Sequence, residues 1–213
     1  MRVDNAFVLS LWERIPGSGG QQAFRELFEL YYARLVHFSK EYVEHKEAAE
    51  EVVSDVFLKI WNKRKTNPPV THPETYLYTA VRNQSLNYLR QFSTMRVVHL
   101  PDLEQTQICD PVTPAAATEW KELLFRLDQA VDALPPERRR IFKLMKEEGF
   151  KAKEVADILG ISVRTVETHL YKAVKQLQVV ILPYLSDKRS DGAKMPPEIG
   201  LVIVGLLSLL GQA

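Results

Sequence analysis

The sequence lacks the residue patterns that several common classes of protein need. Cys109 is the single cysteine, so an internal disulfide bond is excluded, which fits a reducing compartment. No Gly-rich phosphate-binding loop is present, no Cys/His cluster has the spacing of a zinc site, and none of the five histidines follows a glutamate by three residues as in helical di-metal proteins. We therefore expect no metal, no cofactor and no enzymatic activity.

Long apolar segments are also scarce. The first residues include Asp4 and Glu13 and lack the apolar core and cleavage site of a secretory signal, so we expect a cytoplasmic protein. An apolar run of twelve residues, 199–210, lies near the C-terminus, but a helix needs about twenty such residues to cross a bilayer. This tail either folds onto a domain as a terminal helix, masks a functional surface, or docks on a partner or a membrane surface. The sequence leaves these alternatives open.

Positive charge is in short supply overall, since the formal net charge is only +1, but it is unevenly distributed. Residues 1–58 contain six Lys or Arg against ten Asp or Glu, whereas residues 59–96 contain seven Lys or Arg against one Glu. An acidic segment followed by a basic one predicts two surfaces with different partners.

Apolar residues repeat with helical periodicity, and no segment alternates as a strand would, which predicts an all-α fold. The expected helices cover 5–15, a long segment from Gln21, 46–63, 74–92, 119–133 and 136–146. In the fourth helix the residues expected to face inward are Leu77, Val81, Leu86 and Leu89. Three prolines punctuate an acidic segment without periodicity. We therefore predict two small helical domains, 1–94 and 117–183, joined by a flexible linker at 95–116 and followed by the apolar tail 184–213.

The segment 151–177 has the pattern of a helix-turn-helix. Small Ala156 suits a close helix crossing, Gly160 suits the turn, and Ser162 can cap the second helix. The second helix has an apolar stripe, which comprises Val163, Val166, Leu170, Ala173, Val174 and Leu177. Its opposite face is polar and includes Arg164, Thr165, Thr168, Lys172 and Lys175. Such a helix normally lies in the DNA major groove, and the alternative is a helical hairpin with a solvated outer face.

Three motifs together resemble the extracytoplasmic-function (group IV) sigma factors, the small initiation subunits of bacterial RNA polymerase. The run from Glu50 to Trp61, EEVVSDVFLKIW, is similar to the family's polymerase-binding helix. The run YLYTAVRN from Tyr76, followed by NYLR from Asn87, is similar to its promoter-melting helix. The run LPPERR from Leu134 leads into the helix-turn-helix, as in the family's second DNA-binding domain. The apolar tail resembles the C-terminal ends of some members from Bacteroidetes.

The resemblance implies a role for each of three residue groups. Polymerase binding is implied for Glu51, Asp55, Phe57, Leu58, Lys59 and Trp61. Recognition and melting of the −10 promoter element are implied for Lys63, Arg64, Lys65, Arg82, Asn83, Asn87 and Arg90, with the loop 66–71 as a place for a flipped base. Recognition of the −35 element is implied for Arg164, Thr165, Glu167, Thr168, Lys172 and Lys175. Trp61, Tyr76, Tyr78 and Tyr88 are candidates for stacking on bases, with packing in the core as the alternative.

The partners that this resemblance implies are core RNA polymerase, promoter DNA and a membrane-bound anti-sigma factor, without a small-molecule substrate. The resemblance thus predicts an alternative sigma factor that directs transcription initiation from −10 and −35 elements. One alternative is a helix-turn-helix regulator that is not a polymerase subunit. A response regulator would need an alternating β/α receiver domain, which the helical N-terminal half does not offer.

Overall fold

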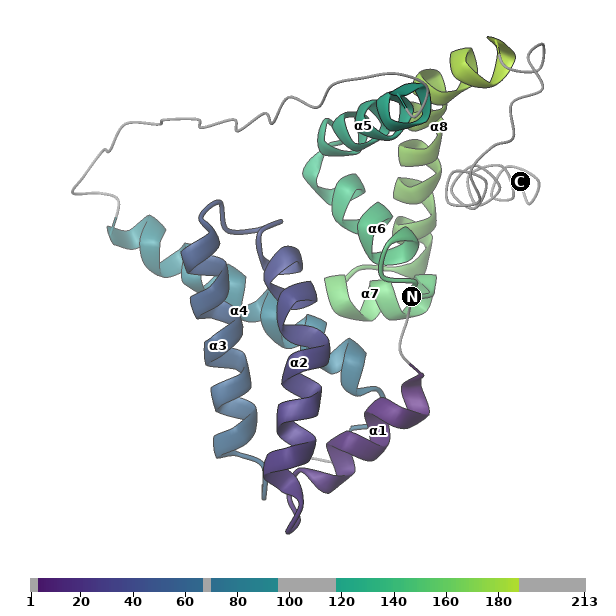
Figure 1. Ribbon diagram of the computed structural model, residues 1–213. Helices are drawn as coiled ribbons and strands as arrows, with labels where there is room; N and C mark the ends of the chain where they lie inside the picture. The colour runs from purple at the N-terminus through teal and green to yellow at the C-terminus, as the bar shows by residue number, and fades with distance from the viewer. Residues whose placement is uncertain (1–3, 67–69, 96–117, 188–213) are drawn as a thin grey trace. The chain divides into compact units, whose positions relative to one another are not determined.

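The computed structural model describes residues 4–66, 70–95 and 118–187, and within them every regular element is an α-helix (Figure 1). The helices are α1 (Asn5–Arg14), α2 (Gly20–Ser39), α3 (Lys46–Asn62), α4 (Pro73–Met95), α5 (Thr118–Asp132), α6 (Pro136–Lys146), α7 (Ala152–Leu159) and α8 (Val163–Asp187). The expected all-α fold is therefore confirmed, and the expected helix bounds agree within a few residues. The largest difference is α8, which continues to Asp187. The tail 199–210 and most of the linker lie outside the described residues.

The chain divides into two compact units, which we describe separately. One unit comprises Met1–Asp102 together with Lys151–Ser162, and the other comprises Leu103–Phe150 together with Val163–Ala213. The division falls in the expected linker and also on either side of α7, which groups with the first unit. In the described part of the chain, no helix combines the length and apolar character that a bilayer crossing requires.

In the first unit, α2 and α3 run side by side, and α4 packs against both (Figure 1). The apolar residues that repeat with helical periodicity form the buried faces: Leu27, Tyr31 and Leu35 of α2 and Ala49 and Val53 of α3 are fully buried. Aromatic rings fill the contact between these two helices. The ring of Phe57 lies 4.9 Å from that of Phe28, centroid to centroid, in an edge-on arrangement. The α2–α3 contact is therefore apolar, and it is held by ring packing.

The contact between α2 and α4 is instead partly polar. Glu74, in the first turn of α4, is only 1% exposed, and its carboxylate accepts a hydrogen bond from the Arg34 guanidinium of α2 at 3.4 Å. Further along, the buried hydroxyls of Ser39 and Ser85 are hydrogen-bonded at 3.0 Å. Because a buried polar group must find its partner, these two pairs fix how α4 lies along α2.

The prediction that Leu89 faces inward is wrong. Leu77 and Val81 are fully buried, but Leu89 is 41% exposed. At 100° per residue, Leu89 lies roughly 60° from the centre of the buried stripe of α4. The inward position one turn before it belongs to Ser85, which is fully buried and hydrogen-bonded. The prediction assigned the buried face by its leucines, whereas Ser85 and not Leu89 occupies that face.

In the second unit, α8 packs against α5 and α6. Five of the six residues expected in its apolar stripe are buried, namely Val166, Leu170, Ala173, Val174 and Leu177. The sixth, Val163, is 39% exposed, so that part of the prediction is wrong. Val163 is the first residue of α8, where a side chain has helical neighbours on one side only. Ile141 and Leu144 of α6 complete this core.

The turn between α7 and α8 is the one that the sequence predicts. Gly160 has φ of 62° and ψ of 39°, the left-handed conformation that a residue with a Cβ adopts only at a cost. Its N–H and that of Ile161 both donate to the Ala156 carbonyl, which ends α7. At the other end of α7, the Glu154 carboxylate accepts from the Lys151 backbone N–H at 2.7 Å. These bonds satisfy backbone groups that a helix of eight residues would otherwise leave unpaired.

Candidate nucleic-acid and polymerase interface

The outer face of α3 carries most of the residues expected to bind polymerase. Glu51, Leu58 and Lys59 are exposed, and Asp55 is half-buried. Leu58 is the most notable of them, because an apolar side chain that is 56% exposed costs free energy in water. A carboxylate, an ammonium and an exposed leucine on one helix face suit a protein partner.

Phe57 differs from the other residues in this group, because it points into the core. It is 2% exposed, and its ring packs edge-on against Phe24 as well as Phe28. Trp61 is intermediate: its ring lies 5.0 Å from that of Phe24, while the Arg64 guanidinium sits 4.2 Å above it. Arg64 also donates to the Trp61 carbonyl at 2.9 Å, so it covers the end of α3.

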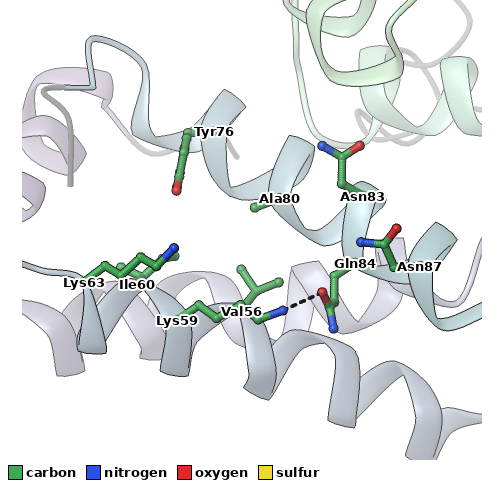
Figure 2. Close-up of a pocket in the computed structure, with 9 residues that line it drawn as sticks. All are labelled: Val56, Lys59, Ile60, Lys63, Tyr76, Ala80, Asn83, Gln84 and Asn87. Atoms are coloured by element: carbon green, nitrogen blue, oxygen red, sulfur yellow. Dashed lines mark hydrogen bonds between the residues drawn. The ribbon is translucent and has the colours of Figure 1, made fainter. Parts of the chain in front are cut away.

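A pocket of about 190 Å³ lies between α3 and α4 (Figure 2). It brings together three of the residues expected to meet the −10 element, Lys63, Asn83 and Asn87. The remaining lining residues are Val56, Lys59, Ile60, Tyr76, Ala80 and Gln84. The pocket thus has an apolar floor, three side-chain amides from α4, and two ammonium groups, one from α3 and one from the residue that follows it. Amides and cations around a small apolar cavity can bind a base and its phosphate.

The two asparagines are each held by an arginine of the same helix. Arg82 donates to the Asn83 Oδ1 at 3.3 Å, and Arg90 donates to the Asn87 Oδ1 at 3.5 Å. Each amide keeps its NH₂ group for a further hydrogen bond. Lys63, Lys65 and Arg90 are exposed, whereas Arg82 is half-buried. Residues 67–69 of the loop expected to hold a flipped base lie outside the described residues.

Sequence reasoning missed Gln84, which lies between the residues expected to bind polymerase and those expected to meet the −10 element. Its Oε1 accepts from the Lys59 Nζ at 2.7 Å, and its Nε2 donates to the Asp55 Oδ2 at 3.2 Å (Figure 2 shows the first of these bonds). The available signal was its place directly after Asn83 on the helix expected to meet DNA. The structure also places Lys59, expected to bind polymerase, on the wall of the pocket.

The candidate tyrosines divide by burial. Tyr78 is fully buried against Phe38, so it belongs to the core. Tyr76 is 36% exposed and lines the pocket, with its ring edge-on to Trp12 at 5.3 Å. Burial raises the pKa of the half-buried Tyr88 hydroxyl, and the nearby charge of Glu51 raises this pKa further. Tyr88 therefore stays a neutral phenol near the charge of Glu51 on α3.

In the second unit, α8 displays the residues expected to meet the −35 element. Arg164, Glu167, Thr168, Lys172 and Lys175 are exposed, and Thr165 is half-buried. The Thr168 hydroxyl donates to the Arg164 carbonyl at 2.8 Å, which leaves its oxygen to accept from a base or water. The face therefore offers three cations and one carboxylate, a combination that can bind phosphates and distinguish bases.

Comparison with protein families covers both units. Residues 27–93 match sigma-70 region 2, and residues 124–177 match sigma-70 region 4. The first match contains α3, the pocket and all but the last two residues of α4, and the second contains the helix-turn-helix.

Individual relatives agree with these matches. The chain is 27% identical over 147 residues to the ECF RNA polymerase sigma factor SigE of Mycolicibacterium smegmatis. The aligned part is 68% of this chain and 55% of SigE, so the chain spans little more than half the length of that relative. It is 25% identical over 171 residues to the ECF RNA polymerase sigma factor SigL of Mycobacterium tuberculosis, covering 79% of this chain and 95% of that one.

Solved structures show the same fold at low identity. The sigma factor RpoE of Bartonella quintana, in complex with the anti-sigma factor NepR, gives a TM-score of 0.56 at 20% identity, over 74% of this chain and 96% of that chain. CnrH in complex with the cytosolic domain of CnrY gives 0.55 at 19% identity, over 82% and 97%. The two sigma-70 matches together cover more than half of the chain, and its relatives SigE and SigL are ECF RNA polymerase sigma factors. The protein therefore belongs to the extracytoplasmic-function sigma factors, the alternative sigma factors that direct transcription by RNA polymerase.

Proposed function

We propose that this chain binds core RNA polymerase through the outer face of α3 and selects promoters through the pocket of the first unit and through α8. The observation that carries the proposal is the pocket, where Lys63, Asn83 and Asn87 converge next to the exposed face of α3. The protein then contributes binding and DNA strand separation, while the polymerase supplies the chemistry, so the chain is no enzyme in itself. Such a subunit works in the cytoplasm.

On the polymerase side, Glu51, Asp55, Leu58 and Lys59 make the contact. The exposed Leu58 supplies the apolar centre, and the charged neighbours orient the partner. Phe57 and Trp61 act through their packing under this face, which keeps α3 straight and correctly rotated.

On the promoter side, the first unit binds the −10 element as a melted strand. The amides of Asn83 and Asn87 read a base edge, since an unstacked base exposes its donors and acceptors. Lys63, Arg64, Lys65, Arg82 and Arg90 neutralise phosphates, which supplies affinity that is independent of sequence and dependent on salt.

On the duplex side, α8 reads the −35 element with Arg164, Thr165, Glu167, Thr168, Lys172 and Lys175. The division into domains 1–94 and 117–183, with the linker 95–116 between them, lets each part reach its own element.

Regulation by an anti-sigma factor is the second part of the proposal. RpoE is in complex with the anti-sigma factor NepR, and CnrH is in complex with the cytosolic domain of CnrY. These complexes support an anti-sigma partner for this chain, which we propose to be membrane-bound. We also assign the chain to a Bacteroidetes-like subgroup, which the apolar run 199–210 supports.

Run-off transcription with purified core polymerase tests the function. The chain should bind core polymerase and start transcription at a defined set of sites when fragments of the source genome serve as template. Sequencing the transcript ends should then reveal a shared pair of elements upstream. A chain that neither binds the core enzyme nor changes the start sites would rule out the sigma-factor function and favour a regulator that binds DNA alone.

Glu167→Arg tests the role of α8. The exposed carboxylate can accept a hydrogen bond from cytosine N4, or it can repel other sequences, so its replacement by a cation should change the preferred −35 base by roughly tenfold or more, about 1–3 kcal/mol per base pair. Competition between promoter variants in run-off transcription measures the change. Lys153→Arg serves as the control, because it introduces an arginine on α7, outside α8, without changing the net charge. An unchanged −35 preference in Glu167→Arg would remove this residue from the readout.

A further inference from the structure

Asp55 and Lys59 lie one helical turn apart on α3, in the order that favours a direct ion pair. An acidic residue four positions before a lysine is the better of the two orientations on a helix. In the described residues, however, the two side chains do not meet each other. The Asp55 carboxylate instead accepts from the Gln84 Nε2 at 3.2 Å, and the Lys59 ammonium donates to the Gln84 Oε1 at 2.7 Å.

Glutamine is suited to this place because its amide carries a donor and an acceptor on one rigid plane. A glutamate could accept from Lys59 but would repel Asp55. An apolar residue could do neither, and the two charges on α3 would then be free to pair. Gln84 comes from α4, so the bridge also joins the two helices that form the pocket.

The bridge determines where the Lys59 ammonium lies. Lys59 lines the pocket together with Asn83 and Asn87, and Figure 2 shows its chain extending toward Gln84 on the opposite helix. In a direct pair with Asp55, the same ammonium would turn back along α3, and each charge would neutralise the other. The Asp55 carboxylate, for its part, receives a neutral N–H from Gln84 in place of the Lys59 ammonium.

We propose that Gln84 is a positioning residue that keeps Asp55 and Lys59 apart, so that the carboxylate stays available to polymerase and the ammonium stays at the pocket, facing the promoter strand. This inference rests on the proposed function, because it assumes that the pocket receives single-stranded DNA. It moves Lys59 from the residues that contact polymerase to the cations that contact DNA backbone, and it gives Gln84 a role without a contact of its own to DNA.

The test is the salt dependence of binding to single-stranded DNA, measured with the full chain and a labelled oligonucleotide of mixed sequence, about 12 nucleotides long. The slope of log affinity against log salt concentration counts phosphate contacts, at about 0.7 per contact for a single strand. In Gln84→Ala, Lys59 should pair with Asp55 and leave the DNA. We expect the slope to become shallower by about 0.7 and the affinity at low salt to fall about threefold.

The double variant Asp55→Asn with Gln84→Ala separates positioning from packing. Without the carboxylate, Lys59 has no ion pair to enter, so the slope should return to that of Asp55→Asn alone. A purely structural role for Gln84 would lower the thermal midpoint without this recovery. Gln91→Ala is the matched control, because Gln91 is an exposed glutamine on the same helix. If Gln84→Ala folds poorly, Gln84→Met replaces it in the test, because methionine retains the length and packing of the side chain. Its slope should be shallower by the same amount.

The possible outcomes test the positioning role of Gln84 separately from the proposed sigma-factor function. A Gln84→Ala or Gln84→Met slope equal to that of the unmodified chain, or a double variant without recovery, overturns the positioning role and leaves the sigma-factor function standing. A chain that binds no single-stranded DNA also overturns the inference, whereas the function is decided separately by run-off transcription.

Discussion

Replacement of Phe57 by alanine should lower the free energy of unfolding of the first unit by about 3–5 kcal/mol, as for other buried Phe-to-Ala changes. The side chain is 2% exposed, and its ring packs against Phe24 and Phe28 of the neighbouring helix. Removing it leaves a cavity between α2 and α3, which costs stability in addition to the lost burial of the ring. Urea denaturation followed by circular dichroism measures the loss.

Leu58→Ala is the matched change, because Leu58 is the next residue on the same helix and is 56% exposed. Its stability should stay within about 0.5 kcal/mol of the unmodified chain, as for ordinary surface positions. Its affinity for core polymerase should fall about tenfold, since an exposed apolar side chain at the centre of an interface contributes about 1–2 kcal/mol.

The two variants together decide how Phe57 serves polymerase binding. If Phe57→Ala keeps its stability but loses polymerase, the phenyl ring reaches the partner directly and does not act through the core. If Leu58→Ala binds polymerase as well as the unmodified chain, the outer face of α3 is not the contact surface.

The sequence was sufficient to predict the helices, because their apolar periodicity is strong and their ends are marked by proline or glycine. Gly160 illustrates this, since a left-handed turn was expected there and was found. Burial was harder to predict at the helix margins. Leu89 and Val163 are apolar and near a buried stripe, yet both are exposed because the neighbouring helices do not cover those positions.

The candidate site could be predicted only in part, because it depends on contacts between helices. Periodicity along α3 and α4 does not say which side chains meet across them. The place of Gln84 directly after Asn83 therefore did not reveal its hydrogen bonds to Asp55 and Lys59. Similarly, Phe57 belongs to a motif implied in polymerase binding, and only the packing of α2 on α3 shows that the ring is internal. The pairing of Glu74 with Arg34, forty residues apart, was equally invisible.

Replacement of Arg34 by methionine should destabilise the first unit by about 3–5 kcal/mol, a loss comparable to that of Phe57→Ala. Arg34 is a partner of the Glu74 carboxylate, which is 1% exposed, and its guanidinium also lies over the Tyr31 ring at 5.2 Å. Methionine fills much of the same space but leaves the buried charge without this partner. Arg25→Met is the control, because Arg25 lies on the same helix in an exposed pair with Glu29, and no measurable loss is expected.

A second substitution shows whether the buried charge is the cause. In the double variant Arg34→Met with Glu74→Gln, the carboxylate is neutral, so a large part of the lost stability should return in urea denaturation. If the double variant is as unstable as Arg34→Met, the loss comes from the packing of the arginine and not from its charge. Because Glu74 lies in the first turn of α4, the pair anchors the helix that carries Asn83 and Asn87. A variant that loosens this anchor should therefore weaken binding to single-stranded DNA even at temperatures where the unit remains folded.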